Sequence, residues 1–431
     1  MESLNVGIAG LGTVGQGVWK YLLDHAEPLG QRAGGKLVPY RAAVRSLEKR
    51  REVAIPSSQL TTDPMELATD PNIDILCELM GGVELARKVT LTALEHGKSV
   101  ITANKAMICD HGAELFAAAE RTGSRLYYEA STAGGIPIIK AVREGLVANQ
   151  FPLIYGILNG TCNYILTRME REQKTFEEIV VDARRLGYVE ADESLDLDGW
   201  DTAHKTAILA FLAHGRWISM KEMPVEGIRD VTLDDLAWAR ELGYRVKLLA
   251  VITRHLKNNC IFADVHPTLI PEDFILANVD EVFNGVSVTG DIVGETTYIG
   301  RGAGQNPTAS AVITDLVDAT IDRLNGVTLP PHASRGPTPE LARLDDVRRP
   351  FYLRLRVADR SGVLADIARI MAQHNISIEQ LVQKPHREPD QAHLIMTTHT
   401  TSERQMRDAI RDLEADRAVQ SKPLLLRILK V

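Results

Sequence analysis

The chain has 431 residues, of which 45% are hydrophobic and 25% charged, so it has the composition of a globular protein and the length for about two or three domains. Its formal net charge of −8 disfavours nucleic acid and anionic membranes as partners. No apolar run approaches the ~20 residues of a membrane helix, and no basic segment of a secretory signal precedes the first apolar stretch, so we expect a cytoplasmic protein.

Strand and helix patterns alternate over the first 130 residues. Strands are predicted at residues 4–9, 36–44, 73–80, 99–102 and 125–129. Helices are predicted at residues 13–25, 83–96 and 110–121. The alternation indicates an α/β protein whose residues 1–130 form a doubly wound, parallel sheet of the Rossmann type.

A glycine-rich loop joins the first strand to the first helix. It has the pattern G-x-G-x-x-G and consists of Gly10, Leu11, Gly12, Thr13, Val14 and Gly15. Such a loop lets the backbone approach a pyrophosphate and directs a helix N-terminus at it. After the second strand, Arg45 stands where an NAD site usually has an acidic residue. Arg45 can pair with a 2′-phosphate, so we expect NADP, with NAD possible; a solvated surface arginine is the alternative.

The middle of the chain has a different pattern. Helices are predicted at residues 162–170, 175–185 and 198–214. Strands are predicted at residues 153–158, 245–253, 260–267, 282–289 and 296–299. We therefore expect residues 131–304 to form an α+β domain with an open mixed sheet, and residues 305–326 to return as a helix to the first domain.

A proline-containing linker at residues 327–349 precedes a compact unit at residues 350–431. Strands are predicted there at residues 351–357, 376–383, 393–400 and 421–428, and helices at residues 363–374 and 403–414. The order βαββαβ is that of a ferredoxin-like domain.

The densest group of polar residues runs from position 187 to position 205. Asp201 and Lys205 are four positions apart, so they share one face of a helix. A lysine beside a carboxylate can protonate the alkoxide that forms when a hydride reduces an aldehyde. Glu190 and Asp196 can bind a substrate ammonium. The alternative is an ordinary ion pair on an exposed helix, next to a solvated acidic loop.

Residues 1–330 resemble the homoserine dehydrogenases. The resemblance rests on the glycine-rich loop, on Thr102-Ala103-Asn104-Lys105-Ala106, on Asn159-Gly160-Thr161-Cys162-Asn163-Tyr164, on residues 187–205, and on residues 302–311. The third and fourth of these segments are long and specific, and their order along the chain also agrees with the family.

The resemblance implies an oxidoreductase that interconverts L-aspartate β-semialdehyde and L-homoserine, on the route to threonine, methionine and isoleucine. It implies that residues 131–304 serve catalysis and dimerisation. In this family pattern Lys205 donates and accepts the proton, Asp201 orients it or the substrate, and Lys105 stabilises the oxyanion. Glu190 and Asp196 bind the amino end of the substrate. The further residues assigned to the cofactor are Asn104, Lys105 and Gly302.

The resemblance also implies a monovalent cation such as Na+, held mainly by backbone carbonyls of the loop at residues 129–137. Its ligands would be Glu129, Thr132, Gly134 and Ile136. Oxygen ligands suit a hard cation. No transition metal is expected, because the histidines have no ligand spacing to a partner.

Residues 350–431 resemble the ACT domain, a βαββαβ unit that pairs with its own copies and binds amino acids. The resemblance rests on residues 359–364 and 375–378. It implies an effector site at Asp359, Gly362, Val363 and Asn375, with L-threonine as the effector, in a homodimer or homotetramer. The alternative is a module that only oligomerises the chain.

Two other functions remain open from the sequence. One is a related dehydrogenase for a different amino-acid aldehyde. The other is a non-catalytic amino-acid sensor, which would have no need for the acid–base pair of Asp201 and Lys205.

Overall fold

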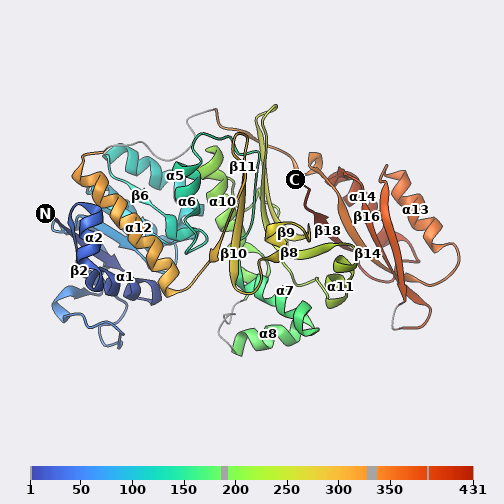
Figure 1. Cartoon of the computed structure of the whole chain (residues 1–431), viewed down its shortest axis with the longest axis horizontal. Coiled ribbons are helices and arrows are strands. Elements are labelled where there is room, and N and C mark those ends of the chain that lie inside the picture. The colour runs from blue at the N-terminus through green and yellow to red at the C-terminus, as the bar shows by residue number, and fades with distance from the viewer. Residues whose placement is uncertain (1, 186–192, 328–336, 386–387, 431) are drawn as a thin grey trace. The chain divides into compact units, whose positions relative to one another are not determined.

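The computed structural model describes residues 2–185, 193–327, 337–385 and 388–430 (Figure 1). Glu190, a predicted substrate ligand, lies outside these residues. The chain divides into two compact units. The first comprises residues 1–151, 204–222 and 290–338, and the second comprises residues 152–203, 223–289 and 339–431. In the part that the structure describes, no helix is long and apolar enough to cross a membrane.

A parallel sheet forms the centre of the first unit, in the strand order β3-β2-β1-β4-β5-β6. The strands are β1 (Ser3–Ala9), β2 (Lys36–Ala43), β3 (Leu60–Thr61), β4 (Ile75–Glu78), β5 (Ser99–Thr102) and β6 (Leu126–Tyr127). The order reverses between β1 and β4, and ligands bind at such a switch point, outside the carboxyl ends of the strands. The prediction of a doubly wound sheet of the Rossmann type is confirmed.

Helices cover this sheet, and one of them comes from much later in the chain. They include α1 (Thr13–Asp24), α2 (Ala26–Ala33), α3 (Pro64–Thr69), α4 (Glu84–Glu95), α5 (Lys105–Thr122) and α12 (Gln305–Leu324). Helix α12 lies beside α1 (Figure 1). Its residues Ala309, Val312 and Leu316 share a hydrophobic core with β1. The sequence pattern missed α2, α3 and β3, because each is too short to show a period. The remaining elements of this unit include α6 (Ile138–Lys140) and β11 (Gly294–Arg301).

A mixed sheet runs through the second unit in the order β10-β7-β8-β9-β18-β14-β16-β15. The strands are β7 (Leu153–Ile157), β8 (Tyr244–His255), β9 (Cys260–Pro271), β10 (Phe283–Gly290), β14 (Phe351–Ala358), β15 (Ile378–Pro385), β16 (Gln391–Thr398) and β18 (Leu424–Ile428). Along this order, β9 and β18 pair in parallel and the other neighbours are antiparallel. The predicted mixed sheet is confirmed.

The C-terminal module has the predicted order βαββαβ, with helices α13 (Val363–Gln373) and α14 (Glu403–Ala415) over a core of its own. One feature differs from the sequence prediction. The module shares the sheet of the middle domain, because β18 pairs with the far end of β9, where Arg427 stands opposite Thr268. The pattern had ended that strand at Pro267, but β9 continues to Pro271 and offers an edge to β18.

The other helices of the second unit are α7 (Gly160–Glu172), α8 (Phe176–Arg185), α9 (Ser194–Leu197) and α11 (Leu233–Glu241). Helix α10 (Trp200–His214) begins in the second unit and continues in the first.

Candidate active site

The glycine-rich loop lies at the carboxyl end of β1 and leads directly into α1. Gly10 has a φ of +104°, which a larger residue adopts only with strain, and a side chain on Gly15 would collide with the carbonyl oxygen of Gly10. Among the described residues other than the two chain neighbours of Gly12, no atom lies within 4 Å of the position where Gly12 would carry a side chain. The turn therefore has an open backbone surface that a pyrophosphate can approach, and no side chain caps the start of α1.

A pocket of about 410 Å³ opens beside this loop. Its lining includes Gly10 to Gly12, the segment from Ala43 to Ser46, Lys49 and Arg51. Arg45, which the sequence analysis proposed for the 2′-phosphate, is among the lining residues. Lys49 and Arg51 were missed because they follow β2 in an irregular segment, although the basic run at residues 49–51 was a visible signal. Arg51 also fixes this segment, since its guanidinium donates to the carbonyl oxygens of Ser46 at 2.6 Å and Lys49 at 2.9 Å.

The segment at residues 102–106 is held by a carboxylate that the sequence analysis did not single out. The hydroxyl of Thr102 donates to Glu78 Oε2 at 2.6 Å, and the same hydroxyl oxygen accepts from the backbone N–H of Asn104 at 3.0 Å. Asn104 Oδ1 accepts from the N–H of Met107, so Asn104 caps α5 and Lys105 is its first residue. This cap explains why α5 begins earlier than position 110, where the pattern placed it. Asn104, Lys105 and Gly302 are not among the residues that line the pocket described above.

Glu78 is fully buried, and burial raises its pKa to about 7. Between the ordinary value of 4.5 and this raised pKa, the folded chain keeps a proton that the unfolded chain has released. Stability therefore falls as the pH rises through this window. We expect the stability of Glu78→Gln relative to wild type to increase by about 3 kcal/mol between pH 4 and pH 8, because the variant has no carboxyl group to ionise. Thermal midpoints at both pH values test this, with exposed Glu84→Gln as control, and parallel pH profiles of wild type and Glu78→Gln would contradict it.

The predicted cation loop contains one buried carboxyl group, that of Glu129, and a second, that of Asp315 on α12, lies against it. Both carboxylate oxygens of Glu129 accept backbone N–H groups, from Ile139 at 2.9 Å and Lys140 at 2.8 Å. The N–H of Glu129 donates to Asp315 at 2.9 Å. Burial raises the pKa of Glu129 to about 7, and burial and then Glu129 raise the pKa of Asp315 well above its usual value. Two acids in one buried site are a setting that a bound cation would stabilise.

The other predicted cation ligands lie on the same loop. Thr132 is buried, the N–H of Ile136 donates to the carbonyl of Ala133 at 2.9 Å, and Gly134 lies against the carbonyl of Gly302. Gly302 therefore contacts this loop. Among the described residues, no group of three or more histidine, cysteine or acidic side chains could hold a metal ion.

In the second unit, Asn159 joins the two specific motifs. Its side-chain amide donates to Asp196 Oδ1 at 2.7 Å and to Asp201 Oδ2 at 2.9 Å. Its Oδ1 accepts from the N–H of Cys162 at 2.7 Å and so caps α7. Because Asn159 is only 4% exposed, water competes little for these three hydrogen bonds. The structure thus brings Asp196 and Asp201 to one buried amide.

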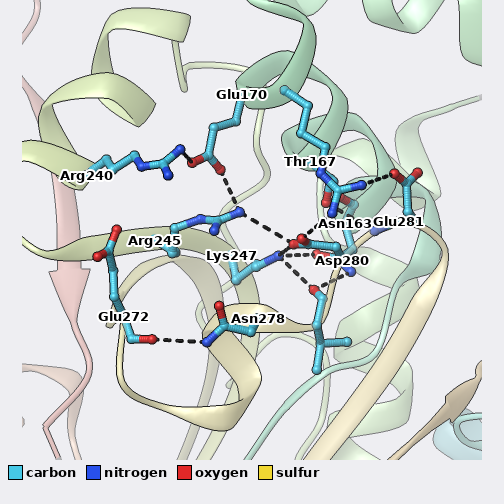
Figure 2. A network of polar contacts seen from close by, with 12 residues as sticks. Asn163, Thr167, Glu170, Arg240, Arg245, Lys247, Glu272, Asn278, Asp280 and Glu281 are labelled. Atoms are coloured by element: carbon cyan, nitrogen blue, oxygen red, sulfur yellow. Dashed lines mark hydrogen bonds and ion pairs between the residues drawn. The ribbon is translucent and has the colours of Figure 1, made fainter.

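Helix α7 is anchored by a buried lysine that the sequence analysis did not identify (Figure 2). Lys247 Nζ on β8 donates to Asn163 Oδ1 at 3.0 Å, to the carbonyl of Val279 at 2.7 Å and to Asp280 at 2.9 Å. Burial lowers the pKa of Lys247, and Asp280 opposes this effect. Asn163 belongs to the same motif as Asn159, so Lys247 fixes the helix that presents Asn159 to the carboxylates.

Lys205 follows Asp201 by one turn on α10, and both residues are half-buried. Lys105 and Lys205 belong to the first unit, whereas Asp196 and Asp201 belong to the second. The helix itself therefore fixes the spacing of Asp201 and Lys205 that the sequence predicted.

The four predicted effector residues fall into two groups in one copy of the chain. Gly362 and Val363 begin α13, and Asp359 precedes them, with its Oδ1 accepting from Gln383 at 3.1 Å. Asn375 follows the other end of this 11-residue helix, about 16 Å away along its axis.

The first unit has a glycine-rich loop at the switch point of a Rossmann-type sheet. In the second unit, Asp196 and Asp201 share one amide, and Asp201 lies on the helix that also carries Lys205. These features define a dinucleotide-dependent oxidoreductase. Comparison with known proteins agrees. Family models match the homoserine dehydrogenase NAD-binding domain at residues 10–129, homoserine dehydrogenase at residues 137–317 and the ACT domain at residues 351–418. The chain belongs to the homoserine dehydrogenase family, and it carries a C-terminal ACT domain.

Relatives match along almost the whole length of the chain. It is 40% identical to the homoserine dehydrogenase of Neisseria gonorrhoeae and 41% identical to that of Pseudomonas aeruginosa, with 99% of each chain covered. The crystal structure of a homoserine dehydrogenase from Thiobacillus denitrificans has a TM-score of 0.93 at 44% identity, covering 100% of this chain and 99% of that one. A hyperthermophilic archaeal homoserine dehydrogenase in complex with NADPH has a TM-score of 0.63 at 26% identity, covering 74% of this chain and 98% of that one.

Proposed function

We propose that the chain reversibly reduces L-aspartate β-semialdehyde to L-homoserine, with NADP as its preferred cofactor, on the route to threonine, methionine and isoleucine. The observation that carries this proposal is that the side-chain amide of Asn159 is hydrogen-bonded to both Asp196 and Asp201. Asp201 in turn lies one helical turn before Lys205 on α10.

In this proposal the charged side chains of the site each have a role in the reaction. The nicotinamide cofactor supplies the hydride when it is bound. The carboxylate of Asp196, together with Glu190, binds the ammonium of the substrate. The ammonium of Lys205 donates its proton to the carbonyl oxygen as the C–H bond forms, and takes it back in the oxidation direction. Asp201 orients Lys205 or the substrate, and Lys105 stabilises the developing oxyanion.

The pocket beside the glycine-rich loop supports the preference for NADP. Three cationic side chains, Arg45, Lys49 and Arg51, line it, as a 2′-phosphate requires. The archaeal structural neighbour is itself a complex with NADPH. Thr13, Val14 and Gly15, at the start of α1, present the helix N-terminus to the pyrophosphate. Asn104, Lys105 and Gly302 complete the cofactor contacts in this proposal.

The double variant Arg45→Ala/Lys49→Ala should raise the KM for NADP by roughly tenfold to a hundredfold, because two charge-assisted contacts to the phosphate are lost. The KM for NAD should change less than twofold, since NAD has no 2′-phosphate. Steady-state kinetics with both cofactors measure this. Arg50→Ala is the matched control, because Arg50 is exposed and is not among the residues that line the pocket. An equal rise of the KM for NADP and the KM for NAD would show that Arg45 and Lys49 do not bind the 2′-phosphate.

We also propose that the loop at residues 129–137 holds a monovalent cation such as Na+ through Glu129, Thr132, Gly134 and Ile136. The buried carboxyl groups of Glu129 and Asp315 lie at this loop, and a bound cation would favour their ionised forms. Its role would be structural. Replacing Na+ by tetramethylammonium should then lower the thermal midpoint, while an unchanged midpoint would argue against the ion.

The ACT domain is proposed to bind L-threonine and to inhibit the enzyme. Asp359, Gly362 and Val363 lie at one end of α13 and Asn375 at the other, so one amino acid can contact all four only if two copies of the chain each supply one end. This geometry supports a homodimer or homotetramer.

One assay separates these functions. Homoserine oxidation is measured with NADP and with NAD, in the presence and absence of L-threonine. Activity that is higher with NADP and slowed by threonine supports the whole proposal. Activity that ignores threonine leaves the ACT domain as an oligomerising module. A chain that binds threonine but turns over no homoserine would be a sensor.

A further inference from the structure

The seam between the C-terminal module and the middle domain contains a buried arginine. Arg427 lies on β18, opposite Thr268 of β9, and is 7% exposed. Its Nε donates to Glu403 Oε1 at 3.1 Å, and its Nη1 donates to Glu226. Burial alone would lower the pKa of Arg427, but Glu226 and Glu403 raise it, so the guanidinium stays charged. Glu403 belongs to the same module as Arg427, whereas Glu226 belongs to the middle domain.

A second arginine, the last residue of the linker before the module, contacts the same strand. Arg349 Nη2 donates to Asp264 at 2.7 Å, and Arg349 Nη1 lies 2.8 Å from His266 Nε2, both on β9. Arg349 also pairs with Glu403 at 3.4 Å. The module and the linker residue before it therefore contact β9 through charged groups as well as through strand pairing. Of the partners that the middle domain supplies, Asp264 and His266 lie on β9 and Glu226 lies outside it.

Glu226 sits in a segment, residues 224–229, that runs along β9. The N–H of Glu226 donates to the carbonyl of Val265 at 2.8 Å, and the N–H of Val265 donates to the carbonyl of Pro224 at 3.0 Å. One side of this segment is thus fixed to the strand that the C-terminal module extends.

The other side of the segment contacts the turn that carries Asp196, whose carboxylate is proposed to bind the substrate ammonium. The N–H of Ile228 donates to the carbonyl of Leu197 at 2.9 Å. A side chain on Gly227 would collide with that carbonyl, so the two backbones are in close contact. Arg229 Nε lies 2.5 Å from Asp198 Oδ1. Leu197 ends α9, and its neighbour Asp196 is the residue bound by Asn159.

We propose that Arg427 is a positioning residue for substrate binding, acting through Glu226 and the segment at residues 224–229 on the turn that holds Asp196. The inference rests on the proposed role of Asp196 in binding the substrate ammonium. It gives the C-terminal module a direct mechanical connection to the substrate site within one copy of the chain. A displacement of β18 along β9 would move Glu226, then Leu197 and then Asp196.

The primary variant is Glu226→Gln. Glu226 is half-exposed, with 46% of its side chain accessible, so the change leaves the buried pairs of Arg427 and Arg349 with Glu403 in place and the module folded. We expect the KM for homoserine to rise about threefold to thirtyfold, the range of coupling through such contacts, while kcat and the KM for NADP change less than twofold. Glu226→Asp, which keeps the charge, should recover part of the loss.

The matched control is Glu241→Gln. It breaks another ion pair between the middle domain and the module, that of Glu241 with Lys384 at 2.6 Å, but away from the segment at residues 224–229. Its KM for homoserine should stay at the wild-type value. If Glu226→Gln and Glu241→Gln raise this KM equally, or if neither raises it, the positioning role is wrong.

Asp196→Asn, assayed in parallel, separates this inference from the function on which it rests. A raised KM for homoserine in Asp196→Asn with a wild-type KM in Glu226→Gln overturns only the role of Arg427. A wild-type KM in Asp196→Asn overturns the proposed substrate contact, and the positioning role with it. Raised KM values in both, with wild-type thermal midpoints, support the inference.

Discussion

Replacing Lys205 by methionine is expected to lower kcat for homoserine oxidation by about 10²- to 10⁴-fold, the usual contribution of a positioned acid–base group. Methionine keeps most of the apolar stem and removes the ammonium, so packing on α10 should change little. The KM for NADP should stay near the wild-type value, because Lys205 is not among the residues that line the pocket beside the glycine-rich loop. Steady-state rates in both directions, with NADP and NAD, measure the effect.

Lys221→Met is the control for this variant. Lys221 is exposed and belongs to the same stretch of the first unit as Lys205, so it tests whether loss of any lysine there affects the rate. A kcat within threefold of wild type for Lys205→Met would remove Lys205 from the proton transfer. Lys105 would then be the next residue to replace.

Local patterns predicted the elements of the fold well. Each long strand and helix of the first unit shows its own periodicity, and the glycine-rich loop marks the point where β1 meets α1. The joining of β18 to β9 had no such signal, because a parallel pair between residues 268 and 427 depends on an edge that appears only when β9 extends past Pro267. Strand pairing over that separation cannot be inferred from the period of either strand.

The candidate site shows the same division. The family motifs assigned roles to Asp196 and Asp201 and contained Asn159 without assigning it one. The contacts of the Asn159 amide with the two carboxylates span 37 and 42 residues of sequence. Glu78 and Lys247 gave no signal, because one acidic or basic residue in an apolar strand reads as an exposed side chain until burial is known. The charges that support a site are therefore harder to find than the residues that contact the substrate.

Asn159→Asp should lower kcat/KM for homoserine by roughly a hundredfold or more, with little loss of stability. The aspartate oxygen can still accept from the N–H of Cys162, so the cap of α7 is kept. What the variant loses is the donor to Asp196 and Asp201, and it places a third negative charge beside them. Two hydrogen bonds to charged groups, each worth about 1.5–3 kcal/mol, become repulsive contacts.

The thermal midpoint and the pH profile show whether this change acts on the site or on the fold. One of the three carboxyls should hold a proton at neutral pH, so the activity that remains should increase as the pH falls from 8 to 6, relative to wild type. Asn325→Asp, at the exposed end of α12, is the control for an added charge on a helix terminus. If Asn159→Asp keeps wild-type kcat/KM with a wild-type thermal midpoint, the bridge between the two carboxylates serves no catalytic purpose. If both fall together and Asn159→Ser, which can still cap α7, recovers the midpoint without the activity, the cap and the bridge are separate functions of one side chain.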